Sequence, residues 1–221
     1  MQSVTAVKIQ KHFSELGIET PMVQTNNKDK HELKKELSGL YRTIHSVIGL
    51  DLNDDSISDT PDRIAKLMVN ESFAGLDYDN FPKCTVVENK FFSGAVTVND
   101  ITVSSLCEHH WERVIMKVSV SYLPKSKVLG LSKFARIADF FGARPIVQER
   151  FTTQLHEALK VILETDDVAV HVRGLHMCMY ARGVAEPCSS TTTCLLGGKY
   201  GVETALREEF MHSIDVTKPI V

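Results

Sequence analysis

The tetrapeptide CEHH at residues 107–110 combines side chains that can bind a metal. Cys107 and His110 are three residues apart, a spacing from which a thiolate and an imidazole can converge from one turn on a borderline-soft cation such as Zn²⁺. Buried thiols and hydrogen-bonded histidines are also common in cores that bind no metal. The spacing alone therefore leaves a structural role open.

A second segment of this kind is HMCMYARG at residues 176–183, at the end of a predicted strand. If the alternation of that strand persists, His176 and Cys178 project from the same face. A site of Cys107, His110 and Cys178 would have three protein ligands and leave a fourth position for water, as catalytic zinc sites do. Two unrelated buried cysteines are an equal alternative on spacing.

The third candidate is a cationic group at a helix start. Ser132, Lys133 and Arg136 lie in the first turn or so of a helix predicted to begin at Ser132, where free N–H groups and the helix dipole favour an anion such as phosphate. Arg182 could join them from the end of the strand. An ordinary solvated helix face is the alternative.

The fourth candidate is VQERFT, with Gln148 and Glu149 near another helix start. A carboxylate can accept two parallel N–H bonds from a guanine edge, and an amide can add a contact. The helix dipole alone would also favour Glu149 at this position.

The composition restricts the classes of protein that these segments can serve. The chain of 221 residues has 25 basic and 28 acidic residues, and the charge of −3 argues against a nucleic-acid-binding surface. It shows no secretory signal and no apolar run long enough to span a membrane. Its odd number of cysteines, 5, predicts free thiols in a reducing cytoplasm.

Hydrophobic periodicity predicts the elements that must position these residues. Three helices come first, and the turn-rich residues 19–30 between the first two are predicted to be a linker. We expect an α+β fold with an N-terminal helical region over residues 1–80 and a catalytic domain over residues 81–221. The expected helices are 4–16, 30–48, one from 60, 132–141, 147–162 and 203–213, and the clearest strands are 111–123, 168–179 and 191–196.

The order CEHH, GLSKFARI, RPIVQERFTTQ, HMCMYARG, TTTCLLGG resembles the GTP cyclohydrolase I family, and TPDRIAK, FAGLDY, NFP and ENKFF resemble it too. The resemblance implies a tunnelling fold, an antiparallel four-stranded sheet with two helices between its second and third strands. It also implies a homodecamer with active sites between subunits. The chain departs from the family at Ile146, where Gln is frequent, and at Cys188 and Cys194, in a stretch usually rich in Ser and Thr.

The resemblance also implies a role for each matched residue. One Zn²⁺ per subunit would be bound by Cys107, His110 and Cys178. The catalytic residues would be His109, His176 and Ser132. GTP would be bound at its triphosphate and ribose by Lys133, Arg136, Arg182 and, from a neighbouring subunit, Arg63, and at its guanine by Gln148 and Glu149.

The implied reaction is the hydrolysis of GTP to 7,8-dihydroneopterin triphosphate and formate. Water activated by zinc would attack guanine C8 while His109 protonates N7. Ring opening, an Amadori rearrangement and pterin ring closure would follow, with His176 and Ser132 moving protons. This is the first step of a pterin or tetrahydrofolate pathway.

Two other functions fit parts of the pattern. One is a non-catalytic ring assembly in which zinc and nucleotide serve regulation. The other is a different pterin or deazapurine enzyme of the tunnelling fold, against which the complete metal set and the phosphate cluster argue.

Overall fold

The computed structural model describes residues 2–23 and 28–220, so residues 24–27 of the predicted linker lie outside the described residues. The chain divides into two compact units, one of which is Pro21–Ala74. The other unit comprises the residues up to Thr20 together with Gly75–Val221. The expected division after residue 80 differs from this one because the first helix belongs to the unit that contains the sheet.

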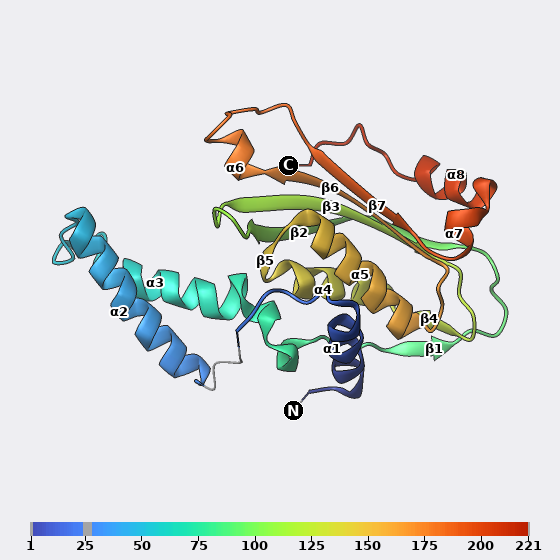
Figure 1. Ribbon diagram of the computed structural model, residues 1–221, viewed down its shortest axis with the longest axis horizontal. Helices are drawn as coiled ribbons and strands as arrows, with labels where there is room; N and C mark the ends of the chain where they lie inside the picture. Colours follow the sequence, from blue (N-terminus) through green and yellow to red (C-terminus); the bar gives the residue numbers. More distant parts are fainter. Residues whose placement is uncertain (1, 24–27, 221) are drawn as a thin grey trace. The chain divides into compact units, whose positions relative to one another are not determined.

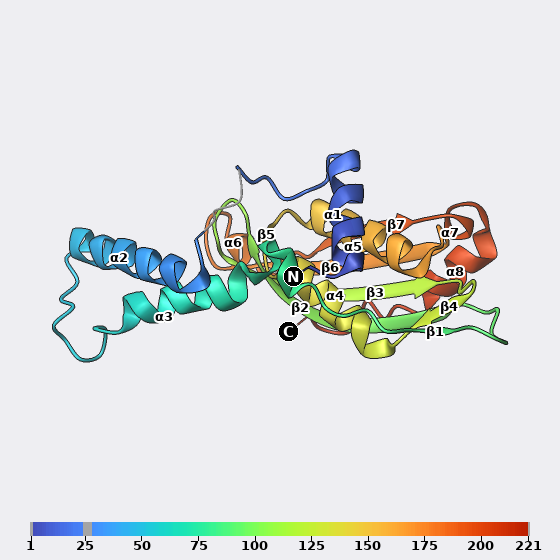
Figure 2. The same ribbon diagram turned by 90° about the horizontal axis from the view of Figure 1, so that it is seen from below.

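The unit Pro21–Ala74 is built on two helices that lie side by side as a hairpin (Figure 2). Asp29 caps the first helix by accepting hydrogen bonds from two backbone N–H groups, and Gly49 ends it in the left-handed conformation at φ 88°. The sequence predicts Thr60 as the cap of the second helix. In the structure Thr60 is instead the first helical residue, and it makes no side-chain cap. The elements are α2 (Lys30–Ile48), α3 (Thr60–Leu67) and a π-helical turn η1 (Met68–Ser72). They are followed by the 3₁₀ turn η2 (Ala74–Leu76), in which the boundary between the units falls, and by η3 (Tyr78–Asn80) in the other unit.

The larger unit contains four long or medium strands that pair antiparallel in the order β2-β3-β6-β7 (Figure 1). Two helices, α4 and α5, fall between β3 and β6 in the sequence, so the second and third of these strands flank them as expected. The bounds are β2 (Val96–Cys107), β3 (Arg113–Tyr122), α4 (Leu131–Gly142), α5 (Gln148–Leu163), β6 (Val168–His176) and β7 (Thr191–Leu196). The α+β class is confirmed.

Three very short strands add to this sheet arrangement. Strand β5 (Pro145–Ile146) pairs parallel to the end of β2, with Cys107 opposite Ile146, and makes the main sheet five-stranded. Strands β1 (Val86–Glu88) and β4 (Lys127–Leu129) pair with each other. Strands of two or three residues show no usable period in a sequence, so the pattern did not predict them.

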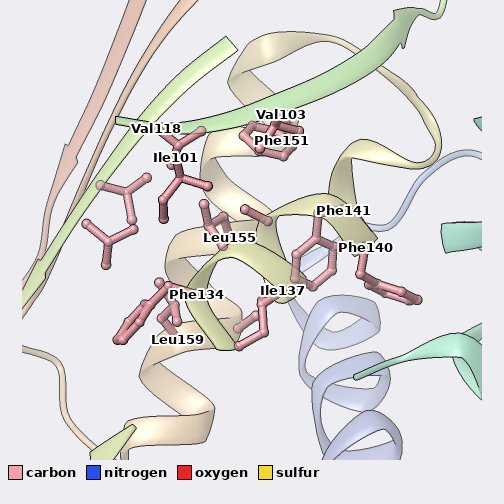
Figure 3. Packing of buried hydrophobic residues seen from close by; sticks show 14 of the residues in the cluster. Ile101, Val103, Val118, Phe134, Ile137, Phe140, Phe141, Phe151, Leu155 and Leu159 are labelled. Atoms are coloured by element: carbon pink, nitrogen blue, oxygen red, sulfur yellow. The ribbon is translucent and has the colours of Figure 1, made fainter. Parts of the chain in front are cut away.

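The core lies between the sheet and the helices α4 and α5 (Figure 3). Alternate residues of β3 point to these helices and are almost fully buried, as the period of two predicted. The helices present their own apolar stripes to this face. The residues of the two helices labelled in the close view are Phe134, Ile137, Phe140, Phe141, Phe151, Leu155 and Leu159.

The opposite face of the sheet is covered in part by two short C-terminal helices, α7 (Lys199–Val202) and α8 (Thr204–His212). Tyr200 and Phe210 are buried there, and the hydroxyl groups of Tyr200 and Ser121 are 2.7 Å apart. This cover explains why Ser121, on the polar side of the predicted strand, is buried. None of the helices in residues 2–23 and 28–220 is long and apolar enough to cross a membrane.

Arg144, between α4 and β5, is a buried cation that fastens the end of α4. Its guanidinium lies over the rings of Tyr78, Phe140 and Phe141 at 4.9–5.4 Å and is 3.8 Å from a carboxylate oxygen of Glu19. Cation–π contacts and the carboxylate offset part of the cost of burying the charge. The chain leading into β5 is thereby held in place.

Helix α1 (Val4–Leu16) is attached to α5 by a partly buried carboxylate. Glu157 lies 2.9 Å from the ring of His12 and 3.1 Å from the ring of His156, and Lys160 also contacts it. The hydrogen bond with His156, aided by His12 and Lys160, lowers the pKa of Glu157 to about 2 against the effect of burial. The carboxylate is thus favoured in the folded chain.

We expect Glu157→Gln to lower the free energy of unfolding by about 2–3 kcal/mol at neutral pH. Because the folded pKa is depressed, the stabilisation is complete above the unfolded value of 4.5 and is lost as pH falls toward about 2. Urea unfolding of both proteins across that range should show the difference shrinking. Glu15→Gln, at an exposed pair with Lys11, serves as the control and should change stability little. A difference that stays constant with pH would contradict this account.

Candidate functional site

Three potential metal ligands converge at one end of the sheet. Cys107 ends β2, His110 lies in the turn that follows, and Cys178 lies in the short helix α6 (Met177–Tyr180). Their ligand atoms all lie within 4.8 Å of one another, and this is the one such group found in residues 2–23 and 28–220. The structure therefore brings together the three residues that the spacing left uncertain.

The turn that carries Cys107 and His110 is closed by backbone hydrogen bonds. The N–H of Cys107 donates to the carbonyl of Glu112, and the N–H of Trp111 donates to the carbonyl of Cys107, both at 2.8 Å. The Nδ1 atoms of His110 and His109 lie 3.8 and 3.9 Å from the Cys107 sulfur. The thiol and both imidazoles are thus placed before any ligand arrives.

Glu108 fastens this turn to the neighbouring helix. Its backbone N–H donates to the carbonyl of Ile146 at 3.0 Å, and its carboxylate lies 2.5 Å from a guanidinium nitrogen of Arg150 in α5. Both side chains of the pair are about three-quarters buried or more. Nothing in the spacing of residues 108 and 150 links them in the sequence, so only the structure reveals this pair.

The expectation that the strand alternation continues through Cys178 is wrong. Strand β6 ends at His176, and residues Met177–Tyr180 form a helical turn. A strand would carry Cys178 onward along the sheet, whereas the turn carries its sulfur back toward Cys107. The two thiols therefore meet through a change of backbone conformation.

The donor set fits a zinc ion. Burial, with the hydrogen bond and charge of neighbouring Cys107, raises the pKa of the Cys178 thiol, and the charge of Arg182 opposes this. A divalent cation between the two sulfurs would stabilise both thiolates. Two thiolates and one imidazole are donors that Zn²⁺ prefers, and three protein ligands leave one position open.

His176, two residues before Cys178, lies close to Glu149. Burial lowers the pKa of His176, while the negative charge of Glu149 opposes the shift. Glu149 itself is exposed, but the neighbouring Gln148 is only 2% exposed and its amide oxygen lies 3.0 Å from the Nε2 atom of His176. Of the two residues predicted to hold guanine, only Glu149 therefore presents its side chain to solvent.

The cationic group lies at the other end of the sheet. Helix α4 begins at Leu131 after Gly130, so Ser132 and Lys133 lie within the first turn and Ser132 is not the cap. Near that end of α4 the rings of Phe134 and Tyr122 are 5.7 Å apart.

The last residue of α4, Gly142, packs closely on Val103 of β2, toward the metal end of that strand. Twelve helical residues span about 18 Å, so α4 separates Ser132 and Lys133 from Cys107 in one chain. Arg182 lies near Cys178, so the structure does not bring it to the cationic group in one chain. Arg63 lies in the other unit, in α3, where it contacts Asp59 at 3.4 Å.

A Cys–His–Cys donor set with a half-buried histidine two residues from one of its cysteines is an arrangement typical of enzymes built around a catalytic metal. The family model described as GTP cyclohydrolase I matches residues 37–215. The chain belongs to the GTP cyclohydrolase I family.

The sequences of two relatives are similar to this chain over nearly its whole length. It is 47% identical over 213 residues to GTP cyclohydrolase 1 of Vibrio campbellii, covering 96% of this chain and 98% of the relative. It is 48% identical over 211 residues to GTP cyclohydrolase 1 of Shewanella denitrificans, covering 95% and 96%. A weaker likeness covers 49% of this chain and 97% of the archaeosine synthase QueF-Like in its apo form, at 22% identity and a TM-score of 0.41.

We expect Cys107→Ala and Cys178→Ala to lose most of their bound zinc, because each leaves only two of the three protein ligands. Elemental analysis of the purified proteins should show about one zinc per chain before the change. Cys188→Ala, which removes an exposed thiol outside the cluster, is the control and should keep its zinc. Full zinc content in either site variant would show that the ligand set is wrong.

Proposed function

We propose that this chain hydrolyses GTP to 7,8-dihydroneopterin triphosphate and formate, as a homo-oligomer with a tunnelling fold. The observation that carries the proposal is the cluster of Cys107, His110 and Cys178 beside His176 and Glu149, in a member of the GTP cyclohydrolase I family. The antiparallel order of the four main strands, with two helices inserted between the second and third, supports the fold assignment. The product would enter a pterin or folate pathway.

Glu149 is the residue that we propose recognises guanine. Its carboxylate can accept two N–H bonds from the guanine edge, whereas adenine offers no matching pair of donors. Its position at the start of α5, close to His176, would bring the base to the metal ligands. The amide of Gln148 is engaged within the fold, so a direct contact with guanine would require it to leave those partners.

The histidines supply the proton transfers. Cys107, His110 and Cys178 would hold a zinc ion, which would lower the pKa of a water toward neutrality and so provide the nucleophile needed at C8 of guanine. His109, next to a metal ligand, is proposed to protonate N7 during that attack. His176 is proposed to move protons when the ribose opens and rearranges, together with Ser132.

The two halves of the proposed site come from different chains. Lys133 and Arg136 would bind the triphosphate and so fix the base at the metal ligands. Lys133 and Arg136 lie about 14 and 9 Å along α4 before Gly142, whose own contact is with Val103 of β2, so we propose that they serve the metal centre of a neighbour. Arg182 would join from the metal side and Arg63 from a neighbouring subunit, in the proposed homodecamer.

Incubation of the zinc-loaded protein with GTP should release formate and yield a pterin that fluoresces after oxidation. Glu149→Gln should raise the KM for GTP about 10- to 100-fold, since a hydrogen bond to a charged group contributes about 1.5–3 kcal/mol. The same variant should also lose the preference for GTP over inosine triphosphate, which lacks the 2-amino group. No formate from the zinc-loaded parent protein would refute the proposed activity.

Mixed assemblies can test the division of the site between chains. Lys133→Ala and Cys178→Ala should each be inactive alone, but co-expression should restore up to about a quarter of the sites, because a chain with an intact metal centre can pair with one carrying an intact cationic group. Cys107→Ala mixed with Cys178→Ala is the control and should restore nothing, since both changes affect the same half. If mixed assemblies of the Lys133→Ala and Cys178→Ala chains show no activity, the whole site would lie in one chain.

A further inference from the structure

The side chain of Gln148 uses its hydrogen-bonding capacity inside the fold. Its amide nitrogen lies 3.2 Å from the carbonyl of Val172, 3.0 Å from the carbonyl of Thr191 and 3.2 Å from the hydroxyl of Thr193. Its amide oxygen lies 3.0 Å from the Nε2 atom of His176. Every one of these partners comes from β6 or β7, so the start of α5 is tied to two strands through one side chain.

These partners determine which way the amide points. Backbone carbonyls only accept hydrogen bonds, so the atom that faces Val172 and Thr191 must be the NH₂ group. With the amide reversed, its oxygen would oppose two carbonyl oxygens in a buried place, which leaves several acceptors unsatisfied. The oxygen therefore faces His176.

A chain of hydroxyl groups requires the same orientation. The Thr152 hydroxyl donates to the backbone carbonyl of Gln148 at 2.8 Å and lies 2.6 Å from the Thr193 hydroxyl. Since the hydrogen of Thr152 is used, Thr193 must donate to Thr152, which leaves Thr193 as an acceptor. Thr193 therefore has no hydrogen left for Gln148, and a reversed amide would place its oxygen against a third acceptor.

We propose that Gln148 is a positioning residue that holds the ring of His176 in the form with hydrogen on Nε2. An amide oxygen only accepts, so Nε2 must be the donor. Nδ1, which has no hydrogen-bond partner among the described residues, is then the nitrogen available for proton transfer. This inference rests on the proposed function of His176, and it assigns Gln148 a task other than contact with guanine.

Gly174 supports this assignment independently. A Cβ atom at residue 174 would lie 2.2 Å from the amide oxygen of Gln148 and 3.3 Å from Nε2 of His176. Real Cβ atoms do not approach that closely, and the nearest obstacle is a side chain, so any larger residue would displace the amide from His176. The glycine leaves the room that this hydrogen bond needs.

Steady-state kinetics of three variants of the full chain would test the assignment. Gln148→Met, similar in size but without an acceptor, should lower kcat at least about tenfold and change KM less, because a well-placed acid–base group contributes about 10²- to 10⁴-fold. Gly174→Ala should lower kcat in the same way although Gln148 is kept. Thr153→Val is the matched control: it removes a hydroxyl of the same helix that donates to the backbone carbonyl of Glu149 and lies outside the Gln148 network, and its kcat should stay within about threefold of the parent.

The ring ¹⁵N signals of His176 provide a readout that does not depend on turnover. We expect the parent protein, labelled in histidine and compared with His176→Asn to assign the signals, to show hydrogen on Nε2, and Gln148→Met to lose this preference. Hydrogen on Nδ1 in the parent, an unchanged kcat in Gln148→Met, or a rise in KM alone would overturn the inference.

Each failure has a separate meaning. If Gln148→Met does not fold, the parent spectrum and Gly174→Ala still decide the matter. If the parent releases no formate, the proposed function fails, while the ¹⁵N signals still report whether Gln148 sets the form of His176.

Discussion

The register of three antiparallel strands is the constraint on which the site depends. In that register Ser105 of β2 lies opposite Val114 of β3, which in turn lies opposite His176 of β6. The end of β2 that carries Cys107 is thereby brought to the end of β6 that carries His176. A slip of one residue would turn the buried face of β3 outward. The packing of the core that selects the register therefore also sets which residues of β2 and β6 lie at the same end of the sheet. The sheet thus both supports the residues of the site and sets their relative positions.

The side chains around the metal ligands differ in how tightly they are held. The Glu108–Arg150 pair and the amide of Gln148 join the strand ends to the start of α5, so the residues next to the chemistry have little freedom. Glu149, one residue further on, is exposed and free to meet a ligand. Under the proposed function, such a combination of fixed reacting groups and an accessible recognition group is what orientation of a small substrate would require.

Much of the fold follows from the sequence because long periodic segments decide their own structure. The helix Val4–Leu16 and the strand Arg113–Tyr122 correspond to clear periods of 3.6 and 2. Strand β5 has only two residues and no period at all. No local pattern shows long-range contacts either: the sequence does not say that Gln148 is buried against His176, or that Ser132 lies at the opposite end of α4 from the residue that packs on β2. The end of β6 was misjudged because alternation cannot show where a strand gives way to a helical turn.

The length of α4 has a consequence for how the proposed enzyme would respond to its surroundings. A single chain would hold the reactive half of one site and the anchoring half of another, so dilution would abolish turnover while every chain stayed folded. Turnover per chain would then rise with protein concentration. Because GTP would bridge two chains, its binding free energy would also favour their association, and by linkage the assembly would tighten as substrate becomes abundant.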